Sequence, residues 1–84
     1  MKIPIGVAGT VLNSRHPGHR VRVADDTENT GGFLIFDWWD GSDGPNENRA
    51  FDSWVESREV LEAYFIEAGW EVEWEASTPA RPRP

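Results

Sequence analysis

The segment from residue 37 to residue 48 concentrates carboxylates, amides and tryptophans in the run DWWDGSDGPNEN. Carboxylate and amide oxygens are the ligands that calcium prefers. The pattern of an EF-hand loop fails here, because Trp39 and Gly41 occupy acidic positions before Gly44, and Ala50 occupies that of the bidentate glutamate. A small calcium-binding domain with a nonstandard site therefore stays an alternative to plain turn chemistry, which uses the same residue types.

Signals for catalysis are weak elsewhere in the chain. Fifteen Asp and Glu residues among 84 make carboxylate pairs inevitable by chance, so they do not indicate a glycosidase. No serine stands in a Gly-x-Ser-x-Gly setting, and the phosphate-binding and dinucleotide-binding fingerprints are missing. We therefore expect no enzyme activity, no cofactor and, outside the calcium alternative, no metal.

Two histidines flank a turn. His16 and His19 stand on either side of Pro17-Gly18, which is a strong turn signal. Side chains three residues apart can face one metal ion, but no third ligand lies near them in the sequence. We expect both to be exposed turn histidines.

Apolar and β-branched residues mark four strands, and polar, glycine-rich segments separate them. The third run, at residues 33–39, is apolar on both faces, as in a central strand, and the last, at residues 70–75, alternates apolar and acidic residues without a break. The predicted strands are residues 2–12, 19–24, 33–39 and 70–75.

A helix is predicted over residues 58–68. Ser57 is a possible N-cap, and Gly69 stands where a helix commonly ends in a left-handed residue. Ser53 with Glu56 also fits a capping box, which predicts a helical turn at 53–56 with Trp54 as a lid between the preceding loop and the helix.

The order strand-strand-strand-helix-strand indicates an α+β fold. We expect a two-layer domain, with a mainly antiparallel sheet of about four strands and one helix on one face. This domain would span residues 1–76, and the Pro- and Arg-rich residues 77–84 would form a disordered tail. Alternation predicts outward arginines at 20 and 22 on the second strand and outward glutamates at 71, 73 and 75 on the last. We therefore expect these two strands to lie side by side, with ion pairs between the arginines and the glutamates.

One helix of this length cannot cover both faces of such a sheet. Eleven helical residues span only about 16 Å, so one side of the central strand would keep little cover within the chain. Exposed apolar surface of this kind usually marks an interface. The two alternating sets are Leu34, Phe36 and Trp38, and Phe33, Ile35 and Trp39.

Charge is distributed unevenly along the chain, whose net charge is −7. Residues 1–24 hold four basic residues and no acid, whereas residues 25–76 hold all fifteen acids against two arginines. The basic segment can pair with the acidic one inside the fold, or the acidic surface can attract a basic partner. Direct binding to nucleic acid is disfavoured, because phosphates require a positive surface. No apolar stretch approaches the about 20 residues of a membrane span.

These observations favour a protein that binds a basic protein partner. A tryptophan rimmed by carboxylates suits such a partner, because tryptophan is enriched at binding hot spots. A homodimer that uses the uncovered sheet face as its own interface, with a structural or regulatory role, stays the alternative. The predicted contact residues are Asp37, Trp39, Asp40, Asp43 and Glu47.

In general profile the chain resembles the immunity proteins, which neutralise bacterial toxins that are often nucleases. The shared features are small size, acidity and a lack of cysteine, and no residue motif carries the resemblance. It implies an inhibitor of a basic, nuclease-like toxin. The excess of arginine over lysine favours a bacterial source, and the lack of cysteine is compatible with the cytoplasm.

Overall fold

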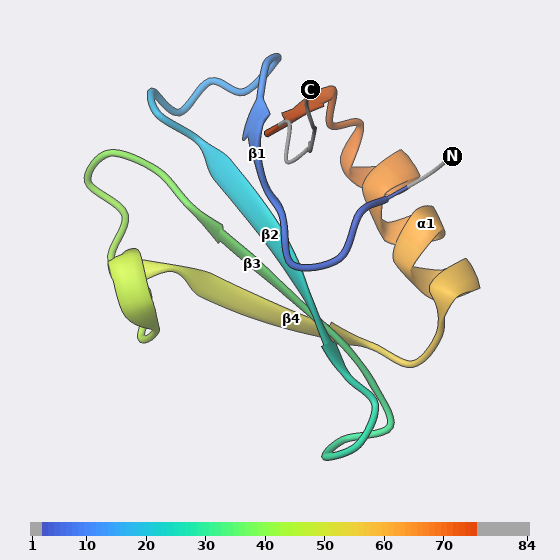
Figure 1. The fold of residues 1–84 in the computed structure, drawn as a ribbon. Helices are drawn as coiled ribbons and strands as arrows, with labels where there is room; N and C mark the ends of the chain where they lie inside the picture. Colours follow the sequence, from blue (N-terminus) through green and yellow to red (C-terminus); the bar gives the residue numbers. More distant parts are fainter. Residues whose placement is uncertain (1–2, 76–84) are drawn as a thin grey trace, which may run out of the picture.

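The computed structural model describes residues 3–75, and the predicted tail at 77–84 lies outside this range. Within this range the chain forms a twisted sheet with one α-helix beside it (Figure 1). In order, the elements are β1 (Ala8–Val11), β2 (Arg20–Asp26), β3 (Gly32–Trp38), the short 3-10 helix η1 (Glu47–Arg49), β4 (Phe51–Val55), α1 (Arg58–Ala68) and β5 (Val72–Trp74).

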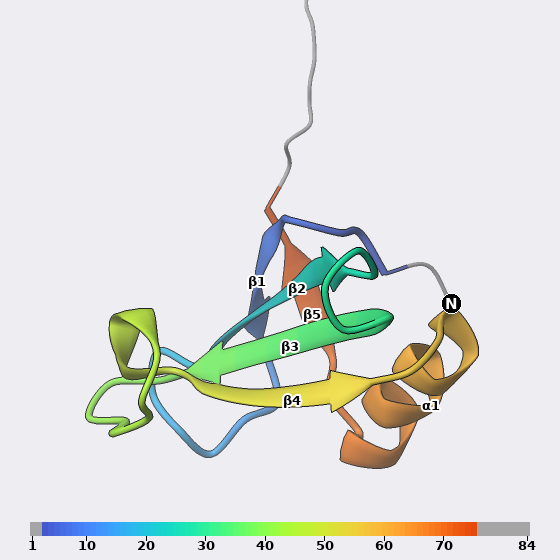
Figure 2. The same cartoon turned by 90° about the horizontal axis from the view of Figure 1, so that it is seen from below.

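All strand pairs in the sheet are antiparallel, and the strand order is β4-β3-β2-β1-β5. The α+β class with a helix packed against an antiparallel sheet is therefore confirmed, with five strands in place of the expected four. Figure 2 shows that α1 and η1 lie at opposite ends of β4. The helix and the loop that carries η1 thus border different parts of the sheet.

Helix α1 has the bounds that the sequence predicts, because both of its ends carry strong signals. The Ser57 side chain accepts a hydrogen bond from the Val60 N–H at 3.2 Å, and Gly69 adopts a left-handed conformation at the C-terminus. Leu61 and Phe65 are buried on its inner side. Within residues 3–75 no helix has the length and apolarity needed to cross a membrane.

The predicted helical turn at 53–56 is wrong, because residues 53–55 belong to β4 and residue 56 lies in the bend before α1. Trp54 pairs with Leu34 and Ser53 with Ile35 along β3. Phe, Trp and Val favour strands, and the backbone groups along this side of β3 need hydrogen-bonding partners. Trp54 is consequently not a lid under the helix: its side chain is 49% exposed, and its Nε1 donates to the Thr30 hydroxyl at 2.9 Å.

The first strand is shorter than predicted, since β1 begins only at Ala8. Gly6 has a positive φ of 80°, which ends the extended conformation, and its N–H donates to the Val23 carbonyl at 2.7 Å. Before it, Ile3 is buried, and its carbonyl accepts a hydrogen bond from Arg58 Nη1 at 3.3 Å. This segment therefore closes one end of the core instead of lengthening the sheet.

The predicted side-by-side arrangement of the second and last strands is also wrong, because β1 lies between them. A Cβ on Gly9 would lie 2.4 Å from Val72 Cγ1 and 2.7 Å from Trp74 Cε3, so the missing side chain lets β5 pack closely along β1. The expected ion pair nevertheless exists, since Arg20 reaches across β1 to the carboxylate of Glu75.

The two faces of the sheet differ in character. The face toward α1 carries the core, and alternation along the paired strands sends the other side chains to the opposite surface, which we call the open face. The core consists of Ile3, Val11, Val21, Val23, Ile35, Val55, Leu61 and Phe65. The open face consists of Ala8, Thr10, Arg20, Arg22, Ala24, Leu34, Phe36, Trp38, Asp52, Trp54 and Glu73.

The turn between β2 and β3 holds an exposed carboxylate in place. Asp25 Oδ1 accepts hydrogen bonds from the Thr27 N–H at 2.9 Å and from the Thr27 hydroxyl at 2.7 Å. These two bonds favour the charged carboxylate, so they lower the pKa of Asp25 below its ordinary value, the backbone bond more than the hydroxyl.

We predict that Thr27→Val raises the pKa of Asp25 part of the way back, because only the hydroxyl donor is lost. A carboxyl group whose pKa is lower in the folded state stabilises the fold above its unfolded pKa of about 3.9, and this contribution disappears as the pH falls through the lower folded value. An NMR titration of the Asp25 carboxyl carbon measures the shift. An unchanged titration midpoint in Thr27→Val would contradict the assignment.

Candidate functional site

Two of the predicted contact residues, Asp37 and Trp39, line the same hollow of about 370 Å³ at the end of the sheet. We call it the histidine hollow. Asp37 lies on the core-facing side of β3, and Trp39 directly follows that strand. The walls of the histidine hollow include Ser14, His16, His19, Asp37, Trp39 and Trp70.

A chain of hydrogen bonds runs along the floor of the histidine hollow. Ser14 Oγ lies 2.6 Å from His19 Nδ1, and His19 Nε2 lies 2.9 Å from Asp37 Oδ2. His19 is buried, and the Asp37 side chain is 17% exposed. Both nitrogens of a buried imidazole therefore have a polar partner, as burial of such a ring requires.

The expectation of two exposed turn histidines is wrong for His19, which is only 5% exposed. This residue directly precedes β2, and its carbonyl accepts the Val11 N–H at 3.0 Å, so the strand alternation continues and directs the ring toward the core. His16 stays half-buried and stacks on Trp39, with ring centroids 4.1 Å apart.

Three other rings contact Trp39. His16 stacks on it at an interplanar angle of 13°, and Phe51 lies at 5.4 Å and 25°. The edge of His19 contacts it in a T-shaped arrangement at 5.3 Å. Trp39 therefore forms part of the wall that positions the two histidines.

The remaining predicted contact residues lie in the loop that follows β3, and all three are exposed. The Asp40 N–H donates to the Pro17 carbonyl at 2.9 Å, which fixes this loop against the turn that carries the histidines. Asp43 is on the same loop, and Glu47 begins η1. Glu47 lines a second hollow of about 200 Å³ on the open face, together with Arg22, Phe36, Trp38, Asn46, Asn48 and Ala50. The structure thus places Asp37 and Trp39 in the histidine hollow and Glu47 at the hollow on the open face, and Trp39 and Asp40 line a further hollow.

The loop from residue 42 to residue 50 is internally hydrogen-bonded. The buried Ser42 hydroxyl donates to the Arg49 carbonyl at 2.9 Å, and the Gly44 N–H donates to the same carbonyl at 2.8 Å. Two consecutive residues, Asn48 and Arg49, adopt left-handed conformations with φ of 60° and 56°. Such backbone is unfavourable for a residue that is not glycine and often occurs at functional sites.

We predict that Arg49→Gly stabilises the protein by about 0.5–1 kcal/mol, because glycine adopts a positive φ without steric cost. Arg49→Ala is the matched control, since it removes the same charge but keeps the backbone strain. Urea denaturation of both variants measures the difference. Equal free energies of unfolding for the two variants would show that the conformation stores no strain.

The apolar side chains of the open face form a row that the rest of the chain partly covers. Leu34, Phe36 and Trp38 are half-buried, and the Arg22 guanidinium lies 5.2 Å from the centre of the Phe36 ring. At the end of the row, Trp54 is about half exposed. As the sequence led us to expect, helix α1 leaves these side chains uncovered. Arg22 and the loop that carries η1 shield part of them instead.

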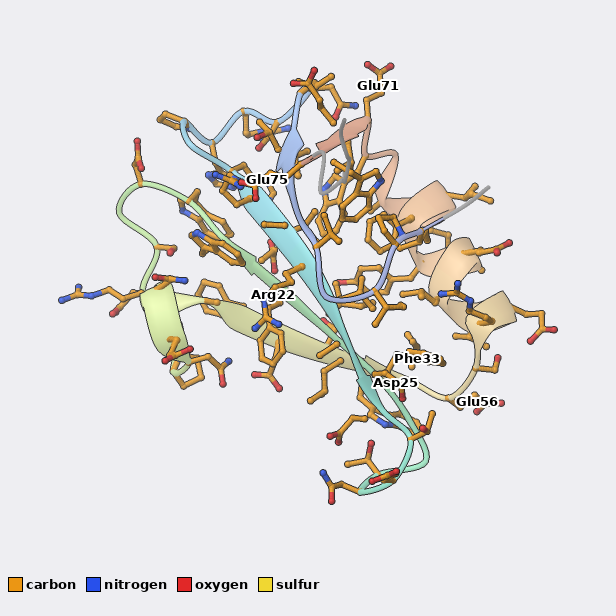
Figure 3. All side chains as sticks on the ribbon, in the orientation of Figure 1. Arg22, Asp25, Phe33, Glu56, Glu71 and Glu75 are labelled. Carbon is orange, nitrogen blue, oxygen red and sulfur yellow. The ribbon has the colours of Figure 1, made fainter. Side chains whose placement is uncertain are left out.

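Exposed carboxylates lie at several separate places on the molecule. Figure 3 shows the labelled Asp25, Glu56, Glu71 and Glu75 at separate places around the sheet and the helix. Residues 3–75 hold all fifteen acids and five arginines, which amounts to a charge of −10 with histidines neutral. Within this range, ion pairs join Arg20 to Glu75 and His19 to Asp37. The other thirteen acids lie in no ion pair with the described residues.

Sequence reasoning found Asp37 and Trp39 but missed Ser14 and His19 as their partners. The three polar groups of the histidine hollow lie up to 23 positions apart, and no short motif connects them. The only available signal was the position of His19 at the start of an alternating strand, which places it on the side of Val21 and Val23. Comparison of the chain with family models, with curated proteins and with the solved structures found no match.

Proposed function

We propose that this protein binds a basic protein partner in a stoichiometric complex, through the open face and the acidic loop beside it. The observation that carries the proposal is the large surplus of carboxylates that no arginine of the described residues neutralises. Because only one arginine forms an ion pair within this range, internal pairing accounts for little of the acidic surface. A positively charged partner would gain both attraction and orientation from this field.

The open face supplies the apolar part of the proposed contact. Trp54, Leu34, Phe36 and Trp38 form a continuous row, because Trp54 pairs with Leu34 and the other three alternate along β3. Asp52 on β4 flanks this row on one side, and Glu47 lines the same hollow as Trp38. On the other side Arg20 and Arg22 of β2 pair with Trp38 and Phe36, and the charge of Arg20 is neutralised by Glu75. Aromatic groups within a polar rim are the usual composition of a protein-binding surface.

The same charges disfavour the alternative of a homodimer. Two copies that each carry a net charge of −7 repel one another at close range. We therefore expect light scattering to show a monomer at a protein concentration of about 10–50 μM. In about 0.15 M salt the Debye length is about 8 Å, so repulsion between closely facing carboxylates is not fully screened. A stable dimer under these conditions would favour the homodimer with its structural or regulatory role.

The most concrete form of this function is an immunity-type inhibitor of a basic bacterial toxin. Phosphate-binding enzymes carry positive surfaces, so an acidic protein of this size can cover such a surface and exclude the nucleic acid. The gene next to this one is the first candidate for the partner. Co-expression of this protein should protect cells from the product of that neighbouring gene. Cells that die despite the co-expression would contradict the proposed inhibitor.

Binding measurements on matched variants test the contact surface. After capture of the partner from a lysate of the native host, calorimetry should give a Kd about tenfold or more higher for Trp54→Ala and for Glu47→Lys. The controls are Ile66→Ala and Glu67→Lys on the outer side of α1, where Ile66 is 65% exposed. We expect these to bind within about threefold of the unaltered protein. An acidic partner, or equal losses in both sets, would contradict the proposal.

A further inference from the structure

We propose that Ser14 is an activated nucleophile, that His19 takes its proton, and that the histidine hollow accepts a small acyl ester. This activity is separate from partner binding, because the hollow lies at the core-facing side of the sheet and not on the open face. The distances are those of a working hydrogen-bond chain: 2.6 Å from Ser14 Oγ to His19 Nδ1 and 2.9 Å from His19 Nε2 to Asp37 Oδ2.

The proton positions follow from the chemistry of the three groups. A carboxylate only accepts hydrogen bonds, so the His19 nitrogen that faces Asp37 carries the proton. In the neutral imidazole the other nitrogen, Nδ1, is then an acceptor, and the Ser14 hydroxyl donates to it. Nucleophile, base and orienting carboxylate therefore have the roles of a Ser-His-Asp triad, with the two ring nitrogens exchanged.

The surroundings fix this arrangement. The His16 N–H donates to Ser14 Oγ at 3.0 Å, so the hydroxyl has one lone pair engaged, its proton directed at His19, and one lone pair left for attack. The His19 ring packs edge-on against Trp39 at 5.3 Å and against Trp70 at 5.5 Å. These contacts hold the imidazole in one orientation, which a general base requires.

The histidine hollow also has room for a substrate. Its volume of about 370 Å³ is at the lower end of the range for small-molecule sites, which is about 300–1,000 Å³. Half-buried Ser14 lines it, and exposed Arg15 lines the same hollow. We assign to the Arg15 guanidinium the stabilisation of the negative charge that develops on the carbonyl oxygen of the ester.

The reaction balances without a cofactor. Ser14 Oγ forms a bond to the carbonyl carbon while its proton moves to His19 Nδ1, and the carbon–oxygen bond to the leaving alcohol breaks as that proton is returned to it. Water then attacks the acyl-serine, gives its proton to the same nitrogen and releases the acid, which regenerates Ser14. Asp37 is a positioning residue, since it acts by holding the proton on Nε2.

A fluorophosphonate probe tests the nucleophile directly, because it forms a Ser Oγ–phosphorus bond and releases fluoride. We expect the folded full-length protein to gain one adduct, mapped to Ser14 by mass spectrometry, and the urea-unfolded protein to gain none. Ser14→Ala should abolish the adduct, whereas Ser53→Ala should retain it, since Ser53 bonds Tyr64 away from the hollow. The folded protein should also hydrolyse p-nitrophenyl acetate with a burst that Ser14→Ala lacks.

Asp37→Asn separates reactivity from structure. The amide NH₂ would donate to Nε2 and leave the proton on Nδ1, so His19 could no longer accept the serine proton. We expect labelling to slow by about a hundredfold or more, and the ¹⁵N shifts of the His19 ring to show the exchanged tautomer. An unmodified folded protein, an adduct that persists in Ser14→Ala, or unchanged labelling in Asp37→Asn with the tautomer exchanged would overturn the proposal.

Discussion

Replacement of Phe65 by alanine is expected to lower the free energy of unfolding by about 3–5 kcal/mol. Phe65 on the inner side of α1 is 2% exposed, and its ring contacts Trp70 at 5.4 Å and Trp74 at 5.9 Å. Removal of the ring leaves a cavity between α1 and the sheet and takes away these aromatic contacts. A domain of this size has a total stability of about 4–11 kcal/mol, so the variant would retain little of it.

The neighbouring residue provides the control for this prediction. Ile66 is 65% exposed, and Ile66→Ala should change the stability by no more than about 0.5 kcal/mol. Urea denaturation followed by tryptophan fluorescence measures both variants. Similar losses for the two would show that α1 does not cover the core in the way described.

Replacement of His19 by alanine is expected to cost about 2–4 kcal/mol. The change removes a buried ring from between Trp39 and Trp70, and it leaves the partly buried carboxylate of Asp37 without its hydrogen-bond donor. An unpaired polar group in such a position costs more than the bond contributes when it is made. Thermal and urea unfolding at pH 7 measure the loss.

Two comparisons make this second prediction specific. His16→Ala removes a half-buried imidazole that stacks on Trp39 from outside, and we expect a cost of only about 1 kcal/mol. A double-mutant cycle between His19→Ala and Asp37→Ala should give a coupling energy of about 1–3 kcal/mol. Additive losses would mean that the 2.9 Å contact contributes nothing to stability.

The two proposals make independent demands on the protein. The proposed partner binding requires the open face and Glu47, whereas the proposed nucleophilic reactivity requires Ser14 in the histidine hollow. Trp54→Ala should therefore leave fluorophosphonate labelling unchanged, and Ser14→Ala should leave partner affinity unchanged. Each result can be obtained without the other, so failure of one proposal leaves the other standing on its own evidence.

The sequence by itself determined the elements whose signals are local. Helix α1 follows from the cap at Ser57, the inward residues Leu61 and Phe65, and the glycine at 69. Alternation likewise identified β2 and β5, and a continuous apolar run identified β3. In each case the residues that specify the structure are neighbours along the chain, so their spacing reflects the geometry directly.

Only the tertiary structure decided how these elements combine. Residues 51–55 form a strand because β3 offers them a partner, although the local residues also fit a helical turn. The placement of β1 between β2 and β5 depends on the close approach that Gly9 permits. The meeting of Ser14, His19 and Asp37 depends on the register of β2 with β3, and a buried imidazole takes whatever polar partners that register brings within reach.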